Sequence, residues 1–274
     1  MTDRERFEVI LEEVGALLDR IGWLCEVVLI GAQALAAEQV AAGEDPLLQV
    51  ETDTGQRLVR GYSFEPDLLI DPVDPELSAR WDELPEILRS CGYQRGGRDF
   101  QWEKQIGDVY VRLDLFRPEG TPEQATPTTE LPRGEQVLAR ASELRFRVGT
   151  RSVRLKTPNP ADFVLMKLDA MRIRRPKNSK DAFDLYAYVR KKTPAVVAAA
   201  LASAREREEA LQSLHKVFAD ENAVGVLDVL DFAGSLEGID RALVARDVVR
   251  TFAEVRRIGL ATAGPQSPSA RSSR

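Results

Sequence analysis

Two short apolar segments, one followed by a glycine turn and the other preceded by two carboxylates, limit the fold of this chain more than any other feature. Val27–Ile30 is a strand-like segment that turns through Gly31–Ala32 into a helical sequence. Glu65 and Asp67 come just before the apolar segment Leu68–Ile70. Residues i and i+2 of a strand point to the same face, so we expect the two carboxylates to face the same way.

A third carboxylate, Asp114, lies in a segment of alternating character from Val109 to Phe116. Such alternation predicts a half-buried strand with Asp114 on its more polar face. Three carboxylates from neighbouring strands can hold a divalent metal, and the backbone N–H groups at a helix start can bind phosphate oxygens. Two structural alternatives to a metal site remain open: an ion pair between Asp114 and Arg112, and an ordinary loop at Glu65-Pro66-Asp67.

These segments resemble the nucleotidyltransferase superfold and, within it, the AbiEii-like toxin and related bacterial branch. The first motif of the family is an apolar strand, then Gly-Gly or Gly-Ser, then a helix, and it resembles Val27–Leu35. The second motif, roughly Arg-x-Thr-x-Asp-x-Asp followed by apolar residues, resembles Arg60–Ile70, and the third acidic residue matches Asp114. The resemblance implies an α/β (α+β) fold, in which a mixed sheet flanked by helices is followed by a C-terminal helical domain.

The chain departs from the family pattern at three positions. Ala32 replaces the second Gly or Ser, Ser63 replaces Thr, and Glu65 replaces the first Asp. The resemblance implies that Mg²⁺ or Mn²⁺ is held by three carboxylates: Glu65, Asp67 and Asp114. It also implies that a nucleotide is bound by residues of the first two motifs: Gly31, Ala32, Ser63 and Arg60.

A second region supports the same resemblance. Pro158–Asp162 is typical of a helix start, and apolar residues follow at helical spacing around Lys167. The region looks like the family signature Pro-x-Asp-x-x-x-x-Lys … Arg … Lys-Asp-x-x-Asp-Leu. The resemblance implies that Lys167 takes part in catalysis by reaching the nucleotide phosphates. It also implies that the same cleft is lined by Arg174, Lys180, Asp181 and Asp184. The alternative is a set of ordinary helix-surface ion pairs.

The activity that the resemblance implies is metal-dependent transfer of an NMP group from an NTP to an acceptor hydroxyl. The acceptor could be a tRNA 3′ end, a protein or a small molecule. The chain could also be the toxin of a toxin–antitoxin pair, with an antitoxin protein as partner. The alternative is a degenerate, non-catalytic nucleotidyltransferase domain that binds a nucleotide or a partner.

With 274 residues, of which 43% are hydrophobic and 30% charged, the chain is long enough for two modest domains. We expect a catalytic domain over residues 1–150, a helical domain over 151–262 that contributes to the nucleotide cleft, and a disordered tail over 263–274. A hairpin is predicted around Asp53-Thr54-Gly55. The hydrophobic spacing predicts helices at Arg4–Ile21, Pro75–Ser90, Ala199–Ala210, Leu211–Ala219, Val224–Phe232 and Ile239–Ile258.

Charge and cysteine content narrow the function classes. The net charge of −6 argues against a protein that binds nucleic acid through its overall field, although basic residues gather between Arg172 and Lys192. The two cysteines and the single histidine make a Cys/His zinc site improbable. The sequence has no signal peptide and no apolar run long enough to cross a bilayer, so we expect a cytoplasmic protein with no membrane contact.

Overall fold

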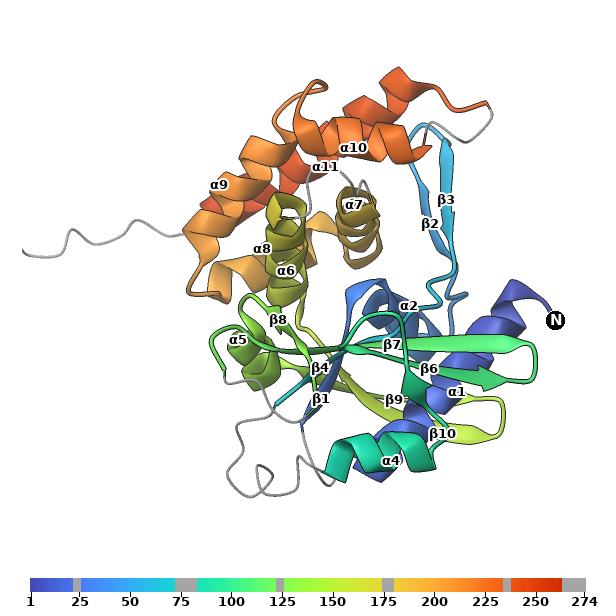
Figure 1. Cartoon of the computed structure of the whole chain (residues 1–274). Coiled ribbons are helices and arrows are strands. Elements are labelled where there is room, and N and C mark those ends of the chain that lie inside the picture. The colour runs from blue at the N-terminus through green and yellow to red at the C-terminus, as the bar shows by residue number, and fades with distance from the viewer. Residues whose placement is uncertain (22–25, 72–82, 122–125, 174–179, 234–237, 263–274) are drawn as a thin grey trace, which may run out of the picture. The chain divides into compact units, whose positions relative to one another are not determined.

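The computed structural model describes residues 1–21, 26–71, 83–121, 126–173, 180–233 and 238–262 (Figure 1). The chain forms two compact units. The first, here called the sheet unit, consists of Met1–Gln49 and Val59–Met166; the second, the helical unit, consists of Val50–Leu58 and Lys167–Arg274.

The sheet unit contains a mixed sheet with the strand order β5-β6-β7-β4-β1-β10-β9, and β8 pairs with β7. Neighbouring strands are parallel in the pairs β1/β10, β4/β7 and β7/β8, and antiparallel in the other pairs. Its strands are β1 (Val27–Ile30), β4 (Asp67–Ile70), β5 (Gln94–Arg95), β6 (Gln101–Ile106), β7 (Val109–Pro118), β8 (Thr129–Leu131), β9 (Ser142–Val148) and β10 (Arg151–Thr157). The predicted α/β class with a mixed sheet is confirmed.

Helices cover both faces of this sheet (Figure 1). They are α1 (Asp3–Ile21), α2 (Gly31–Ala41), α4 (Leu84–Ser90) and α5 (Gly134–Arg140). The apolar side of α1 packs on β10, where Gly15 allows Val153 to come close to the helix. On the opposite face, Val28, Leu69 and Phe116 pack with Val137 of α5.

The first turn of α6 (Pro160–Ile173) belongs to the sheet unit, and its sequence explains why the helix starts there. Asn159 Oδ1 accepts a hydrogen bond from the backbone N–H of Asp162 at 3.0 Å, and Pro160 has no N–H that needs a partner. Both oxygens of the Asp162 carboxylate accept hydrogen bonds from Arg140 of α5. The helix start predicted at Pro158–Asp162 is confirmed.

The helical unit consists mainly of α7 to α11 and the rest of α6. Its helices are α7 (Lys180–Lys192), α8 (Pro194–Ser203), α9 (Arg207–Phe218), α10 (Val224–Ala233) and α11 (Arg241–Ala261). The continuous helix predicted over Ala199–Ala210 is wrong. The Ser203 hydroxyl bonds back to the Ala200 carbonyl, and Ala204 takes an extended conformation that ends α8.

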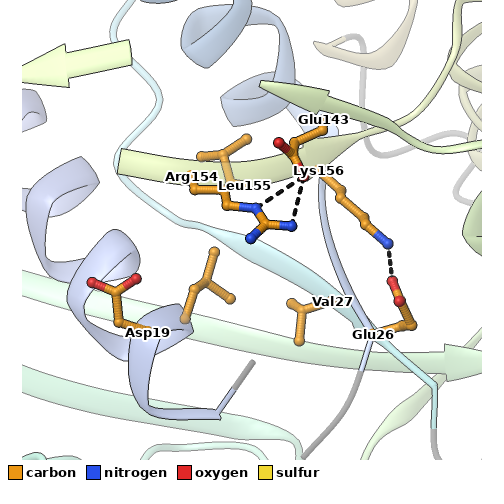
Figure 2. A pocket seen from close by; sticks show the side chains of 8 residues that line it. Asp19, Glu26, Val27, Glu143, Arg154, Leu155 and Lys156 are labelled. Atoms are coloured by element: carbon orange, nitrogen blue, oxygen red, sulfur yellow. Dashed lines mark hydrogen bonds and ion pairs between the residues drawn. The ribbon is translucent and has the colours of Figure 1, made fainter. Parts of the chain in front are cut away.

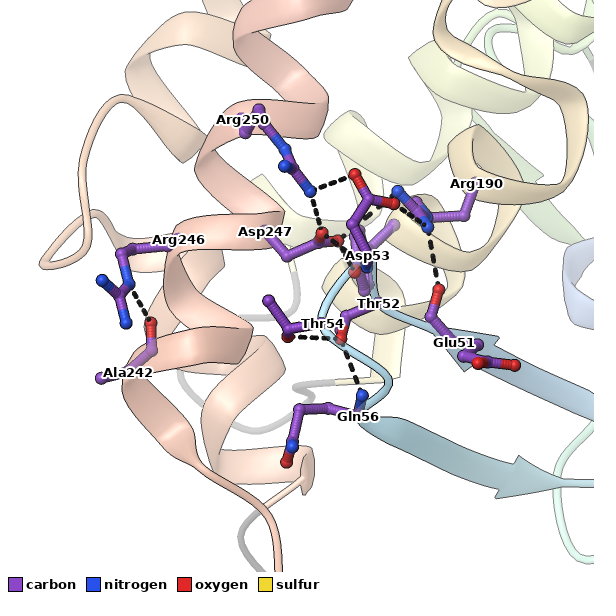
Figure 3. Close-up of polar contacts among 11 residues, drawn as sticks. Glu51, Thr52, Asp53, Thr54, Gln56, Arg190, Ala242, Arg246, Asp247 and Arg250 are labelled. Carbon is purple, nitrogen blue, oxygen red and sulfur yellow. Dashed lines mark hydrogen bonds and ion pairs between the residues drawn. The ribbon is translucent and has the colours of Figure 1, made fainter.

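The predicted hairpin is confirmed between β2 (Leu48–Glu51) and β3 (Arg57–Gly61). Its turn belongs to the helical unit, where a network of charged groups holds it (Figure 3). Asp247 of α11 is 1% exposed and accepts hydrogen bonds from the Asp53 N–H, the Tyr186 hydroxyl and Arg250. Arg190 of α7 donates to Asp53 at 2.8 Å. The turn is therefore fixed by both α7 and α11.

The predicted domain boundary at residue 150 differs from the division seen in the structure. β10 follows that boundary, yet it lies between β1 and β9 and completes the sheet. The division between the units falls instead inside α6, between Met166 and Lys167. The tail predicted over 263–274 and the first part of the helix predicted at Pro75–Ser90 lie outside the described residues. No helix in the described ranges has the length and apolar character needed to cross a membrane.

Candidate functional site in the sheet unit

The register of the sheet places two of the predicted carboxylates beside each other. Asp67 is the first residue of β4 and pairs with Asp114 of the parallel strand β7. Paired residues on adjacent strands lie about 5 Å apart and point to the same face. The same face continues inward through Leu69 and Phe116, which belong to the apolar cluster under α5. Asp67 and Asp114 therefore form an acidic pair at the edge of a packed core.

Gly31 brings the start of α2 against Asp67, one member of this pair. Ile30 lies next to Asp67 in the sheet, and Gly31 follows with φ = +71°. A Cβ at position 31 would lie 2.5 Å from Asp67 Oδ2, so only glycine fits between the helix and the carboxylate. The first turn of α2 contains no acidic residue, and Ile30 provides no side-chain cap. This helix start therefore combines N–H groups with the positive end of the helix dipole.

One oxygen of the Asp114 carboxylate, Oδ1, is buried without a hydrogen-bond partner among the described residues. Burial raises the pKa of Asp114 above its usual value, and the nearby Glu65 carboxylate raises it further. A hydrogen bond from Gln101 and the charges of Arg98 and Arg112 act in the opposite direction and only partly offset this rise in pKa.

Glu65 does not join the acidic pair. It lies outside β4, which begins at Asp67, so the expectation that Glu65 and Asp67 share a strand is wrong. Glu65 Oε1 accepts a hydrogen bond from Arg112 Nη1 at 2.8 Å. Within the described ranges, no three Asp, Glu, His or Cys side chains form a group that could hold a metal ion. The predicted three-carboxylate arrangement is therefore not formed.

Other residues of the predicted nucleotide motifs lie close to the acidic pair in the chain. Ala32 is buried in the first turn of α2, and Arg60 lies in β3. The Ser63 carbonyl accepts a hydrogen bond from Gln33 Nε2 at 2.7 Å. Sequence reasoning missed Gln33, a polar residue that is 1% exposed and joins α2 to the segment before Asp67. A glutamine within the apolar first turns of α2 was the available signal.

The residues of the second predicted motif form a buried ion-pair group in the helical unit. Lys167 Nζ donates to Asp181 Oδ1 at 2.8 Å and to Asp184 Oδ2 at 2.7 Å. Burial lowers the pKa of Lys167, but Asp184 and Asp181 outweigh that effect and raise it overall. Lys180 is exposed at the first turn of α7, and Arg174 lies outside the described residues. Sequence spacing thus identified a real group, whose lysine bonds two carboxylates of the protein.

The acidic pair fits a divalent cation. Mg²⁺ takes oxygen ligands and is commonly held by one or two carboxylates together with substrate phosphates. Asp67 and Asp114 supply two such carboxylates, and Oδ1 of Asp114 accepts no hydrogen bond among the described residues, so it can coordinate a cation. Two carboxylates fill two or three of the six coordination positions of Mg²⁺ and leave the others for phosphate and water oxygens.

Comparisons with known proteins give a fold likeness. The chain is similar to the solved structure of an antigenic nucleotidyltransferase-like protein from Paracoccidioides brasiliensis. The two share 17% sequence identity with a TM-score of 0.47, and the alignment covers 77% of this chain and 88% of that one. No family model matches the sequence, and no curated protein matches it either. The AbiEii-like assignment stays a prediction.

A separate cavity of about 310 Å³ lies at the other end of β1 from Gly31 (Figure 2). Two ion pairs line it: Lys156 of β10 bonds Glu26, and Arg154 Nε bonds Glu143 Oε2 at 2.9 Å. Both basic groups that line the cavity are thus paired with carboxylates of its lining, and Asp19, a third carboxylate there, pairs with Arg151 outside it. None of the predicted site residues lines it.

Proposed function

We propose that this protein transfers an NMP group from an NTP to an acceptor hydroxyl, with Mg²⁺ or Mn²⁺ bound at Asp67 and Asp114. One observation carries the proposal: the two carboxylates are paired on adjacent strands, and one of them, Asp67, lies directly against the glycine that starts α2. A cation site beside a helix N-terminus suits a triphosphate, because the cation and the N–H groups contact different phosphate oxygens.

The protein groups have separable roles in this reaction. A divalent ion bound at the acidic pair supplies charge neutralisation for the triphosphate and orients it. The N–H groups after Gly31 bind phosphate oxygens, and the first turn of α2 itself contains no acidic side chain that would repel them. Asp114 is placed beside Asp67 on the neighbouring strand, so its carboxylate is the candidate to accept the proton of the acceptor hydroxyl. The acceptor oxygen bonds to the α-phosphorus as the bond to the bridging oxygen breaks and pyrophosphate leaves.

The test is an incubation with each α-³²P-labelled NTP, Mn²⁺ or Mg²⁺, and either total bacterial tRNA, a protein mixture or an aminoglycoside. Label in one acceptor with the wild-type protein, and none with Asp67→Asn or Asp114→Asn, is the expected result and identifies the acceptor. Transfer that survives both substitutions would refute the proposed site.

The toxin role implied by the AbiEii-like resemblance belongs to the same proposal. It predicts growth arrest when the protein is expressed in bacteria, and normal growth with Asp67→Ala at equal protein level. Arrest that persists with Asp67→Ala would have a cause other than nucleotidyl transfer. An antitoxin partner would then be a protein whose co-expression restores growth.

A degenerate, nucleotide-binding domain is the second candidate, and the pairing of Glu65 with Arg112 favours it. With Glu65 engaged, the part of the chain that the structure describes places two carboxylates, Asp67 and Asp114, to hold a cation at this site. This candidate predicts NTP binding that is equal with and without Mg²⁺, together with no product from any acceptor. Binding that requires the cation and Asp67 would exclude it.

A further inference from the structure

Arg112 is held in place by the sheet and holds Glu65 in turn. It lies in β7 opposite Glu103 of β6, and its Nε donates to Glu103 Oε1 at 3.3 Å. Its guanidinium carbon lies 5.7 Å from the centre of the Tyr110 ring. Its other bond goes to Glu65, whose side chain is 63% exposed and lies outside any strand. Arg112 is thus the fixed partner and Glu65 the movable one.

The ion pair between Arg112 and Glu65 lies beside the acidic pair. Arg112 precedes Asp114 by two residues on β7, and residues two apart along a strand are separated by about 7 Å. Glu65 is bonded to Arg112 and precedes Asp67 by two residues in the segment that leads into β4. A glutamate released from Arg112 therefore stays within side-chain reach of the acidic pair.

We propose that Arg112 is a positioning residue that keeps Glu65 out of the cation site and so limits the affinity of that site. While Glu65 bonds Arg112, the cation meets two protein carboxylates. When Glu65 is released, a third carboxylate oxygen is available, and oxygen ligands of high charge raise divalent-ion affinity. The inference rests on the proposed function only in taking Asp67 and Asp114 as the cation site.

The experiment measures Mn²⁺ binding to the protein without nucleotide, by the electron paramagnetic resonance signal of free Mn²⁺. The proteins are wild type, R112Q, E65Q and the R112Q/E65Q double variant. R112Q has two effects on Mn²⁺ binding. Loss of the Arg112 charge tightens binding whether residue 65 is Glu or Gln, whereas release of the residue 65 carboxylate tightens it only when residue 65 is Glu. We therefore expect R112Q to tighten Mn²⁺ binding about threefold more in the wild-type background than in the E65Q background.

Two further variants make the result decisive. R112K retains the positive charge but lacks the fork that bonds Glu65 and Glu103 together, so it separates release of Glu65 from loss of charge. We expect R112K to tighten Mn²⁺ binding in the wild-type background only. D67N identifies the site, because it abolishes Mn²⁺ binding at the acidic pair. Circular dichroism of every variant checks that the fold is retained.

Two outcomes would overturn the inference. E65Q would weaken Mn²⁺ binding if Glu65 were itself a ligand in the wild-type protein, and R112Q would act equally in both backgrounds if Arg112 acted by charge alone. With either result, loss of binding in D67N would leave the proposed cation site standing. Absence of Mn²⁺ binding in every variant would overturn the cation site and the inference together.

Discussion

Replacing Lys167 by methionine should destabilise the helical unit strongly. The side chains of Lys167, Asp181 and Asp184 are 10%, 4% and 2% exposed, and the lysine Nζ bonds both carboxylates. Methionine retains most of the volume but removes the cation, and two buried carboxylates then face each other one turn apart on α7. Removing one partner of a buried ion pair costs ~3–5 kcal/mol, and we expect a loss of free energy of unfolding in that range.

The assay is urea unfolding followed by circular dichroism, with Arg172→Ala as the matched control on the same helix. Arg172 is 75% exposed and pairs with Asp169, so its removal should cost less than about 1 kcal/mol. The triple variant K167M/D181N/D184N should recover about half of the loss, because neutral amides need no cation.

The pH dependence has a defined sign. In the wild-type protein the pKa of Lys167 is raised, so its contribution is complete below the usual lysine value of about 10.4 and is lost only as pH rises through the raised value. The K167M variant lacks this group, so it should lose less stability than the wild-type protein as pH rises above about 10.4, and urea unfolding in that range measures the difference.

A different outcome would refute the structural role of Lys167. If K167M unfolded within about 1 kcal/mol of wild type at neutral pH, and NTP binding were lost at the same time, the lysine would be a phosphate ligand whose contacts with α7 contribute little. That result would support the role implied by the sequence resemblance over the one argued from the contacts.

Two further substitutions test the acidic site and the hairpin. Gly31→Ala should cost ~1–2 kcal/mol for the left-handed backbone and also displace the Asp67 carboxylate, so that Mn²⁺-dependent NTP binding is lost in a titration. Gly43→Ala is its control: Gly43 has φ = +77° but no atom within 4 Å of a Cβ, so this variant should show the backbone cost with NTP binding unchanged. Asp247→Ala should lower the free energy of unfolding by ~3–5 kcal/mol, because it leaves the buried donors that bond Asp247 without an acceptor. Its control, Tyr186→Phe, removes a single hydrogen bond to Asp247 and should cost about 1 kcal/mol. Equal losses of stability for the two variants in urea unfolding would contradict this account.

Local pattern determined most of the elements of this protein. The alternation around Asp114 predicts β7, the apolar run after Asp67 predicts β4, and the break at Gly31 predicts the start of α2. These predictions hold because each depends on the backbone preferences and side-chain period of a few neighbouring residues. The helix start at Pro158–Asp162 was predictable for the same reason, since Asn159 bonds the first turn of its own helix.

Tertiary structure decided which of these residues meet. Strand pairing places Asp114 beside Asp67 and inserts β10 into the sheet beyond the predicted domain boundary, and no local pattern specifies which strands become neighbours. The partner of Glu65 is Arg112, 47 residues away, so the carboxylate that the motif assigned to a metal became half of an ion pair. The sequence determined the type and place of each acidic and basic group, whereas their charge partners depended on contacts between distant segments, which form only when the sheet and the helices pack.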